Sequence, residues 1–216
     1  MTVALDHLGL VAGDLTNGAA EFKAMTGVDL GPGGHHPKMA THNRLLSIGG
    51  GSYLELIAPD PESASPARAR WFGLDNMKAE DQVSLRFWMI RVDNLDDALN
   101  LARRSGLDLG VSEDLSRGNL QWRLSVPRTG ILPLDGAAPI LIEWPEGVHP
   151  TSTMEDAGVV LKNLTVRHPN ASAVAAFVKD LGSSLPKVTF ANGPFKLQAD
   201  FAILGKSWTI SSGGEG

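Results

Sequence analysis

Two short strands place an ionisable side chain among apolar neighbours. His7 lies in the middle of residues 5–11 and Glu55 lies in the middle of residues 52–57, and both segments alternate their side chains with a period of two. A buried carboxylate is costly unless it has a partner, so Glu55 needs a cation, a set of hydrogen-bond donors or a proton. The pair indicates a functional site. The alternative for His7 is a core histidine that is hydrogen-bonded to the backbone.

Three further histidines, His35, His36 and His42, lie between these two strands in a segment rich in Gly and Pro. This composition is typical of a loop, and we predict one over residues 35–43. It is either an exposed polar loop or the mouth of a cleft, where imidazoles contact substrate or move protons near neutral pH. His42 is the candidate for proton transfer because it opens the next strand. His36 and Asn43 are candidates for substrate contact.

Charged and aromatic side chains also stand together in the second half of the chain. Glu143 ends an apolar strand and is followed by Trp144, which either packs in the core or contacts substrate. Trp122 and Arg123 are adjacent and must face opposite sides of their strand, so one of them faces the cleft. An inward Arg123 suits an anionic substrate group. Arg86 or Arg123 could also neutralise the carboxylates by bidentate pairing.

The predicted elements repeat along the chain. Residues 1–60 read as a strand, a helix and three strands. The same order recurs over residues 83–150, where a strand, a helix and two further strands, at 120–126 and 139–144, are visible. The segment at 27–31 (GVDLG) recurs at 106–110 (GLDLG), 79 residues later. Residues 61–82 read as a linker, in which a short helix carries two aromatic side chains. Residues 151–216 read as a third copy, which we expect to be structural.

A repeated unit that leaves one sheet face apolar must pack on another copy to bury it. We therefore predict an α+β fold in which two βαβββ modules form curved mixed sheets around a cleft, with a third, partial module. The offset of 79 places Arg86 in the position that His7 has in the first module. The third module lacks an internal partner, which favours edge capping or a homodimer.

The composition narrows the classes of partner. The 216 residues include 24 acidic and 19 basic side chains, for a net charge of −5, so neither nucleic acid nor an anionic membrane is expected. There is no cysteine, which excludes thiolate nucleophiles and zinc–sulfur sites. No apolar run approaches the roughly 20 residues of a membrane span. We expect a cytoplasmic protein whose partner is a small molecule.

The βαβββ repeat, with His in a first strand and Glu in a last strand, resembles the vicinal oxygen chelate superfamily of glyoxalases, extradiol dioxygenases and bleomycin-resistance proteins. It is most similar to the glyoxalase-like domain proteins, over roughly residues 3 to 170. The motifs that carry this resemblance are Asp6-His7-Leu8, Gly33-Gly34-His35-His36-Pro37, Thr41-His42-Asn43, Tyr53-Leu54-Glu55-Leu56-Ile57-Ala58-Pro59-Asp60, Arg70-Trp71-Phe72-Gly73-Leu74, Trp122-Arg123-Leu124 and Leu141-Ile142-Glu143-Trp144.

The resemblance implies one divalent metal in the cleft, held by the first and last strands of the two modules. By position, the ligands would be His7, Glu55 and Glu143, and the ion would be zinc, manganese, nickel or iron. The implied function is a metal-dependent lyase, isomerase or dioxygenase that acts on a small oxygenated metabolite. In that mechanism His42 or the free carboxylate of Glu143 moves the proton.

Arg86 departs from the superfamily pattern, because a guanidinium has only donors and cannot bind a metal. The alternative function is therefore a metal-free protein that sequesters a small molecule. In that case Arg86 replaces the charge of the metal, and the cleft binds its ligand by charge and aromatic stacking.

Overall fold

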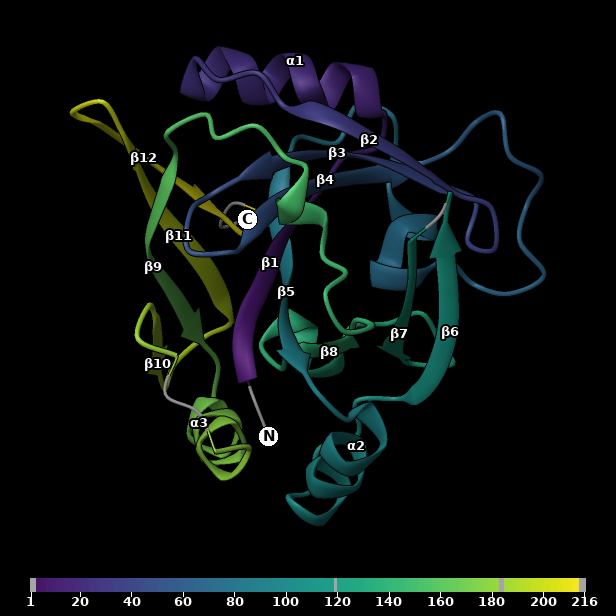
Figure 1. Ribbon diagram of the computed structural model, residues 1–216, viewed down its shortest axis with the longest axis vertical. Coiled ribbons are helices and arrows are strands. Elements are labelled where there is room, and N and C mark those ends of the chain that lie inside the picture. The colour runs from purple at the N-terminus through teal and green to yellow at the C-terminus, as the bar shows by residue number, and fades with distance from the viewer. Residues whose placement is uncertain (1–2, 119, 183–184, 214–216) are drawn as a thin grey trace.

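Eight strands form one mixed sheet that curls into a half-barrel (Figure 1). The computed structural model describes residues 3–118, 120–182 and 185–213. The strand order is β2-β3-β4-β1-β5-β8-β7-β6. The first four strands are β1 (Val3–Val11), β2 (Gly31–His36), β3 (Thr41–Ser47) and β4 (Tyr53–Pro59). The next four are β5 (Ser84–Val92), β6 (Val111–Arg117), β7 (Leu120–Val126) and β8 (Ile140–Glu143).

The two halves of this sheet are built alike. In each half the first strand pairs in parallel with the last, and the other strands follow in antiparallel order. The halves join through β1 and β5, which are antiparallel, and the register skips Asp6 in one strand and Arg86 in the other. These two bulges lie 86 − 6 = 80 residues apart. The predicted α+β fold of paired βαβββ modules is confirmed, and an offset of 80 relates the first strands.

Each module carries one helix on the outer face of the sheet. Helix α1 (Leu15–Thr26) begins after Asp14, and α2 (Leu95–Arg104) begins after Asn94. In both cases the side chain of the capping residue accepts a hydrogen bond from the third N–H of the helix, at 2.8 and 3.0 Å. This bond satisfies one of the free N–H groups at a helix start. Among the described residues, no helix is long and apolar enough to cross a membrane.

The sheet buries apolar side chains on both of its faces. Leu8, Leu54 and Leu56 belong to the core on the helix side. Phe87 and Trp122 belong to a second apolar cluster, on the concave side. Because successive residues of a strand point to opposite faces, a shift of one residue decides whether a side chain reaches the concave face.

The last part of the chain forms a separate four-stranded sheet in the order β10-β9-β11-β12. Its elements are β9 (Val160–Arg167), α3 (Ala171–Asp180), β10 (Val188–Ala191), β11 (Lys196–Ile203) and β12 (Lys206–Ser211). The order of elements is that of the predicted third copy. The pairing differs, because β9 lies between β10 and β11 instead of beside the last strand.

This small sheet covers the outer side of the large one. The ring of Trp208 meets the ring of Phe22 of α1 edge-on at 5.7 Å, and Phe190 lies 6.0 Å from Trp88 of β5. The two sheets also share one apolar core. The third unit therefore packs against the back of the large sheet, away from the concave face.

The connection between the modules crosses the concave side. Short 3₁₀ turns occupy Trp71–Asn76, where the sequence predicts a short helix. Trp71 and Phe72 are buried in the cluster on the concave face, and Phe72 has a positive φ of 60°. These two aromatic side chains therefore cover an apolar surface on the concave face.

Two segments differ from the sequence prediction. Residues 31–36 form the edge strand β2, so the predicted loop over residues 35–43 is wrong at both of its ends. An edge strand tolerates Gly and Pro because one side of its backbone needs no ladder partner. Residues 111–117 form β6, whose polar composition gave no apolar alternation to detect.

Candidate functional site

The concave face of the half-barrel holds a small cavity. The first module lines it with His7, His36, Asn43, Tyr53 and Glu55. The connection and the second module complete the lining with Trp71, Phe72, Met89, Arg117, Trp122, Leu124, Ile142 and Trp144. The cavity measures about 30 Å³, which is room for roughly one or two water molecules. This is little room for an organic ligand while the wall stays in place.

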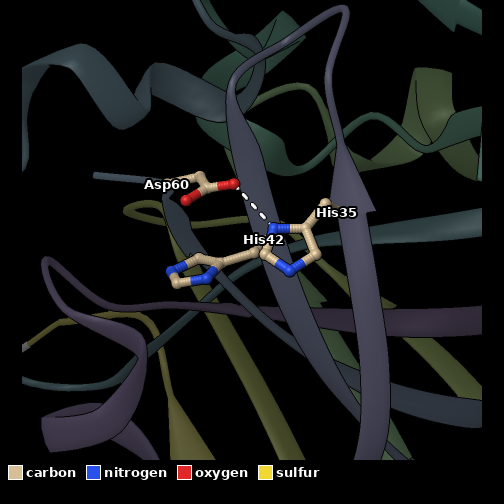
Figure 2. A group of neighbouring side chains, drawn as sticks. All are labelled: His35, His42 and Asp60. Carbon is tan, nitrogen blue, oxygen red and sulfur yellow. Dashed lines mark hydrogen bonds and ion pairs between the residues drawn. The ribbon is translucent and has the colours of Figure 1, made fainter. Parts of the chain in front are cut away.

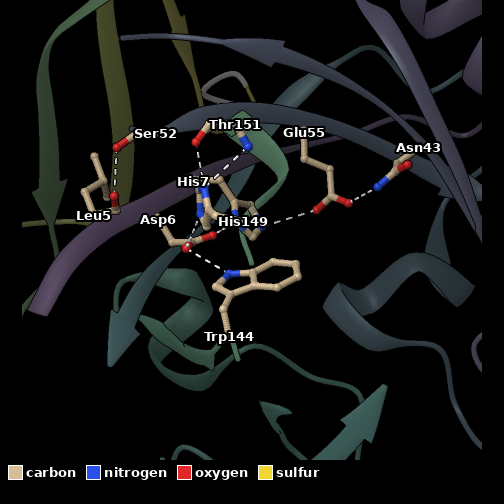
Figure 3. Close-up of polar contacts among 9 residues, drawn as sticks. All are labelled: Leu5, Asp6, His7, Asn43, Ser52, Glu55, Trp144, His149 and Thr151. Atoms are coloured by element: carbon tan, nitrogen blue, oxygen red, sulfur yellow. Dashed lines mark hydrogen bonds and ion pairs between the residues drawn. The ribbon is translucent and has the colours of Figure 1, made fainter. Parts of the chain in front are cut away.

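Two carboxylates flank the imidazole at the floor of the cavity (Figure 3). His7 donates from Nδ1 to Asp6 Oδ1 at 2.6 Å, and its Nε2 lies 3.5 Å from Glu55 Oε2. All three side chains are buried. The Nε2 atom of His7 is shut off from solvent, and its contact with Glu55 is longer than a normal hydrogen bond. His7 thus has one nitrogen fixed by Asp6 and one nitrogen in a looser ion pair that a ligand can replace.

The bulge in β1 makes this arrangement feasible, because it lets Asp6 and His7 contact each other although they are adjacent in a strand. Asp6 Oδ2 accepts two further hydrogen bonds, from Trp144 Nε1 at 3.1 Å and from His149 Nε2 at 3.0 Å (Figure 3). His149 is held in turn by Thr151, at 2.7 Å. Asp6 is therefore a fully buried anchor that fixes the position of His7.

Asn43 orients the second carboxylate. Its Oδ1 accepts hydrogen bonds from the backbone N–H of Gly34 at 2.9 Å and from Arg117 Nη1 at 3.0 Å. Its Nδ2 must then be the group that faces Glu55, and it donates to Glu55 Oε1 at 2.5 Å. Arg117 brings a guanidinium to the wall of the cavity through the same network.

The buried groups titrate together. Burial alone would lower the pKa of His7, but the hydrogen bonds and charges of Asp6 and Glu55 outweigh it and raise that pKa to about 9. Burial alone would raise the pKa of Glu55, but His7 and Asn43 lower it to about 2. The pKa of Asp6 is held well below its usual range, against the effect of burial, by His149 and His7. At neutral pH the site is an imidazolium between two carboxylates.

Aromatic rings set the position of the imidazole. The ring of Tyr53 stacks on His7 with a centroid distance of 4.4 Å, and the ring of Phe87 meets His7 edge-on at 6.2 Å. Phe87 reaches this place because Gly9 opposite it has no side chain: a Cβ on Gly9 would lie 2.0 Å from the Phe87 ring. The cavity is therefore a charged floor enclosed by flat apolar walls.

His36 lines the cavity as predicted but is not part of the charged floor. Its Nδ1 is hydrogen-bonded to Thr41 Oγ1 at 3.1 Å, and its ring meets those of Trp71 and Trp122 edge-on. Burial lowers the pKa of His36 to about 4, so the ring is neutral at physiological pH. A neutral imidazole at the wall suits a contact to a polar ligand group.

The second module carries apolar residues where the first has its ionisable pair. With an offset of 80, the counterpart of His7 is Phe87. Glu55 is in register with Gly9 of β1, two residues after His7. Met89, two residues after Phe87, is in register with Ile140 of β8. Ile140 is therefore the counterpart of Glu55. Among the described residues, the ionisable pair of His7 and Glu55 therefore comes from the first module.

This register corrects the sequence alignment of the two modules. Arg86 is the bulged residue of β5 and corresponds to Asp6, not to His7. Arg86 is half-buried and is not among the residues that line the cavity. The structure therefore does not place its charge where the sequence predicted a replacement for the metal.

Glu143 and Arg123 lie outside the cavity. Glu143 Oε2 accepts from the backbone N–H of Leu95 at 2.6 Å, at the start of α2, and lies 3.4 Å from Arg123 Nη1. Arg123 also pairs with Asp96 at 2.8 Å, while Trp122 takes the position inside the cavity. The structure does not bring Glu143 together with His7 and Glu55, because Glu143 follows the inward Ile142 and faces the helix side.

His42 points to the outer face of the sheet, opposite to Asn43. There it lies beside His35, with ring centroids 5.9 Å apart, and close to Asp60, which directly follows β4 (Figure 2). Burial lowers the pKa of His42, and hydrogen bonds from His35 and Ser63 lower that of Asp60 to about 2 although burial opposes them. His42 therefore belongs to a second polar group, separate from the cavity.

The donor set of the cavity can be compared with what a metal needs. His7 Nε2 and Glu55 Oε2, 3.5 Å apart, could both bind one ion. A catalytic site normally supplies three protein ligands. The counterparts in the second module, Phe87 and Ile140, are not ligands, and Glu143 faces away. Among the described residues, the cavity thus supplies two of the three ligands and does not complete a metal site.

Several residues of the site could not be assigned a role from the sequence. Asp6 is adjacent to His7 in the sequence, and in a regular strand the two side chains would point to opposite faces. The bulge in β1 allows the Asp6 side chain to contact His7. His149 is far away in the sequence and precedes Pro, which gave no signal of its role. Arg117 closes β6, a strand that the sequence did not reveal. Gly118, which follows Arg117, is the one local sequence feature that indicates a turn at the end of this strand.

These features agree with the comparison to known families. The family model of the glyoxalase-like domain matches residues 5–182. The chain therefore belongs to the glyoxalase-like domain family. The match extends past the large sheet and includes β9 and α3. No curated protein matches the sequence.

Solved structures are similar to this chain at low sequence identity. A hypothetical protein from Staphylococcus aureus is 15% identical with a TM-score of 0.59, over 99% of this chain and 87% of that one. The methylmalonyl-CoA epimerase of Mycobacterium tuberculosis is 21% identical with a TM-score of 0.43, over 66% of this chain and 88% of that one. A Streptomyces coelicolor methylmalonyl-CoA epimerase variant is 15% identical with a TM-score of 0.44, over 66% and 99%.

Proposed function

We propose that this chain is an isomerase or lyase that moves a proton on a small oxygen-containing molecule, with His7 and Glu55 as the groups that transfer and stabilise charge. The observation that carries the proposal is the buried line of Asp6, His7 and Glu55 at the floor of a cavity enclosed by aromatic side chains. Ionised groups are costly to bury, and sites of chemistry are where such groups collect.

The proposed step uses both members of the pair. Glu55 takes the proton from a carbon next to a carbonyl group, and the electron pair of the broken C–H bond moves to the carbonyl oxygen. His7, as the imidazolium, donates a hydrogen bond from Nε2 to that developing oxyanion. Return of the proton to a different face or atom gives an isomer, and loss of a neighbouring leaving group gives an elimination.

A ligand also changes the basicity of Glu55. In the free protein the charge of His7 keeps the pKa of Glu55 low. A substrate oxygen that takes the Nε2 hydrogen bond weakens this pairing, while the burial of the carboxylate remains. Burial raises a carboxylate pKa, so the base becomes stronger when the substrate binds. The proposal assigns no step to a metal, because the donor set of the cavity is incomplete.

The walls indicate the class of ligand. Arg117 and the imidazolium of His7 favour an anionic or enolisable oxygen group, and Trp122 and Trp144 favour a flat or apolar body. The small volume favours a molecule of a few heavy atoms. We infer a small 2-oxo or 2-hydroxy acid or a related carbonyl compound as the substrate class.

The test follows hydrogen exchange in D₂O by proton NMR, with a panel of small carbonyl compounds and 2-hydroxy acids. The wild type should wash out a proton next to the carbonyl carbon. Glu55→Gln should slow this exchange at least about 100-fold, since general acid–base catalysis contributes factors of that order. Glu146→Gln removes an exposed carboxylate outside the cavity and serves as the matched control.

Three results would contradict the proposal. Exchange that survives in both Glu55→Gln and His7→Gln would remove the two residues from the mechanism. Exchange that is abolished by a chelator and restored by one divalent ion would support the metal-dependent reaction instead. Quenching of tryptophan fluorescence by a compound that never exchanges would favour the second candidate, a sequestering protein, in which His7 and Glu55 serve only to bind.

A further inference from the structure

We propose that His35, His42 and Asp60 form a binding site for a divalent transition-metal ion on the outer face of the large sheet. This site is separate from the cavity and does not depend on the proposed function. Each of the three side chains offers one ligand atom, and these atoms all lie within 4.8 Å of one another. Figure 2 shows the two imidazoles on neighbouring strands, with the Asp60 carboxylate beside them and joined to His35 by a dashed line.

The sheet itself positions the three donors. His35 of β2 and His42 of β3 are direct register partners, so their side chains stand on the same face. His42 is in register with Ala58 of β4, and Asp60 follows two residues later, which returns the chain to that face. Two adjacent strands thus present one donor each, and the third donor directly follows the next strand, so strand register sets the position of all three.

One donor atom lacks a partner in the structure. The Nε2 atom of His42 is shut off from solvent and makes no hydrogen bond, although a buried polar atom normally has a partner. The carboxylate of Asp60 is 1% exposed, and it lies 2.7 Å from His35 Nδ1. An ion bound between these three side chains would satisfy the His42 nitrogen and replace the proton that His35 now shares with Asp60.

A second layer of contacts holds the carboxylate. Asp60 Oδ1 accepts from the backbone N–H of Glu62 at 3.0 Å, and Oδ2 accepts from the hydroxyl of Ser63 at 2.8 Å. The backbone N–H of Asp60 donates to the carbonyl of Ala40 at 2.9 Å. Metal ligands are commonly oriented by hydrogen bonds of this kind. The Asp60 carboxylate is therefore held in place before any ion arrives.

The chemistry of the donors defines the ion. Two imidazole nitrogens and one carboxylate oxygen suit Zn²⁺ and similar first-row ions, whereas Mg²⁺ and Ca²⁺ prefer oxygen ligands. The side chain of His35 is 61% exposed, so the site opens to solvent on that side. Water would complete the coordination there. Because the three donors lie on β2, β3 and the start of the connection, the ion would tie these segments together.

The experiment measures zinc binding to tag-free, chelator-treated protein by isothermal titration calorimetry and follows the melting temperature. We expect one equivalent of Zn²⁺ to bind and to raise the melting temperature by several degrees, since an ion that binds only the folded state stabilises it. His35→Gln and His42→Gln should each weaken binding by about 10-fold or more. His35 is exposed, so its replacement tests the site without a folding defect.

Two controls separate this site from the others. Glu62→Gln removes a neighbouring exposed carboxylate, and Glu55→Gln removes a carboxylate of the cavity, and both variants should bind Zn²⁺ like the wild type. In the Co²⁺-loaded wild type, the visible absorption of the bound ion should disappear in His42→Gln. Absence of zinc binding, or binding that is lost in Glu55→Gln and kept in His35→Gln, would overturn the proposal.

Discussion

His7 is the residue whose environment departs most from that of an ordinary strand position. It carries a positive charge in a buried site because Asp6 and Glu55 approach it from both sides. Neither carboxylate would be stable there alone, and neither would the imidazolium. The three side chains therefore form one unit, and the protonation of His7 keeps it together.

This unit predicts how stability depends on pH. The folded pKa of His7, about 9, is above the unfolded value of 6.5, so its stabilising effect is complete below about pH 6.5 and is lost as the pH rises through 9. Each pKa unit corresponds to about 1.4 kcal/mol. The free energy of unfolding should fall by up to about 3 kcal/mol between pH 6.5 and 9.5.

Urea denaturation at several pH values measures this dependence. In His7→Gln the fall over the same range should be largely absent, because no imidazole remains to lose its proton. His168→Gln, which changes a histidine outside the cavity, should keep the pH dependence of the wild type. A wild-type stability that is flat between pH 6.5 and 9.5 would contradict a charged His7.

At the scale of the elements, the close approach of β1 and β5 makes the cavity. Gly9 leaves the space that the ring of Phe87 fills, and the ring then contacts His7. The bulges at Asp6 and Arg86 lie on either side of this contact. A bulge increases the local twist and turns side chains to new directions. The seam between the two modules is therefore also the floor of the site.

Gly9→Ala tests this packing. The added Cβ would lie 2.0 Å from the Phe87 ring, so ring or strand must move. Overpacking of this kind typically costs about 1–3 kcal/mol. We expect a lower melting temperature for Gly9→Ala and a partial recovery when Phe87→Leu is added. A Gly9→Ala protein as stable as the wild type would show that the seam adapts without cost.

The elements also show what a period of two can and cannot reveal. The regular strands around Glu55 and Trp122 were predictable, because their inward residues alternate without interruption. The repeat predicted both modules. A bulge leaves no mark in such a pattern, so the sequence alignment shifted Arg86 by one residue and missed the contact of Asp6 with His7. The orientation of Glu143 depends on the same one-residue register.

Edge strands were the second feature that the sequence did not predict. Both β2 and β6 lie at the ends of the large sheet and carry Gly, Pro or charged residues, which a central strand would exclude. The sequence therefore predicted a loop where β2 brings His36 to the cavity and His35 to the outer face. The convergence of His35, His42 and Asp60 depends on strand register, so composition alone could not predict it.

At the scale of the whole molecule, a symmetric frame carries an asymmetric site. The first module supplies the ionisable residues of the floor, and the second supplies apolar and aromatic walls with Arg117. The third unit supports the back of the sheet, and its described residues line no part of the cavity. Duplication of the module thus provides a curved enclosure, while only one copy keeps the chemistry at its centre.

The enclosure has a consequence for the time course of ligand capture. A cavity of about 30 Å³ leaves little room for a metabolite while its walls stay in place, and two of its lining residues, Trp71 and Phe72, belong to the connection and not to the sheet. We predict that movement of this wall precedes ligand entry. The observed association rate should level off at high ligand concentration instead of rising in proportion to it.

Stopped-flow tryptophan fluorescence gives this rate directly, and the plateau is the opening rate of the wall. Phe72→Ala removes a stacked ring and should raise the plateau several-fold, whereas Trp208→Phe, on the far sheet, should leave it unchanged. A rate that stays linear with ligand concentration would mean that the cavity is already open. If the rate levels off, access to the site is governed by how often the rings of Trp71 and Phe72 separate. The half-barrel then limits the rate of ligand entry as well as enclosing the ligand.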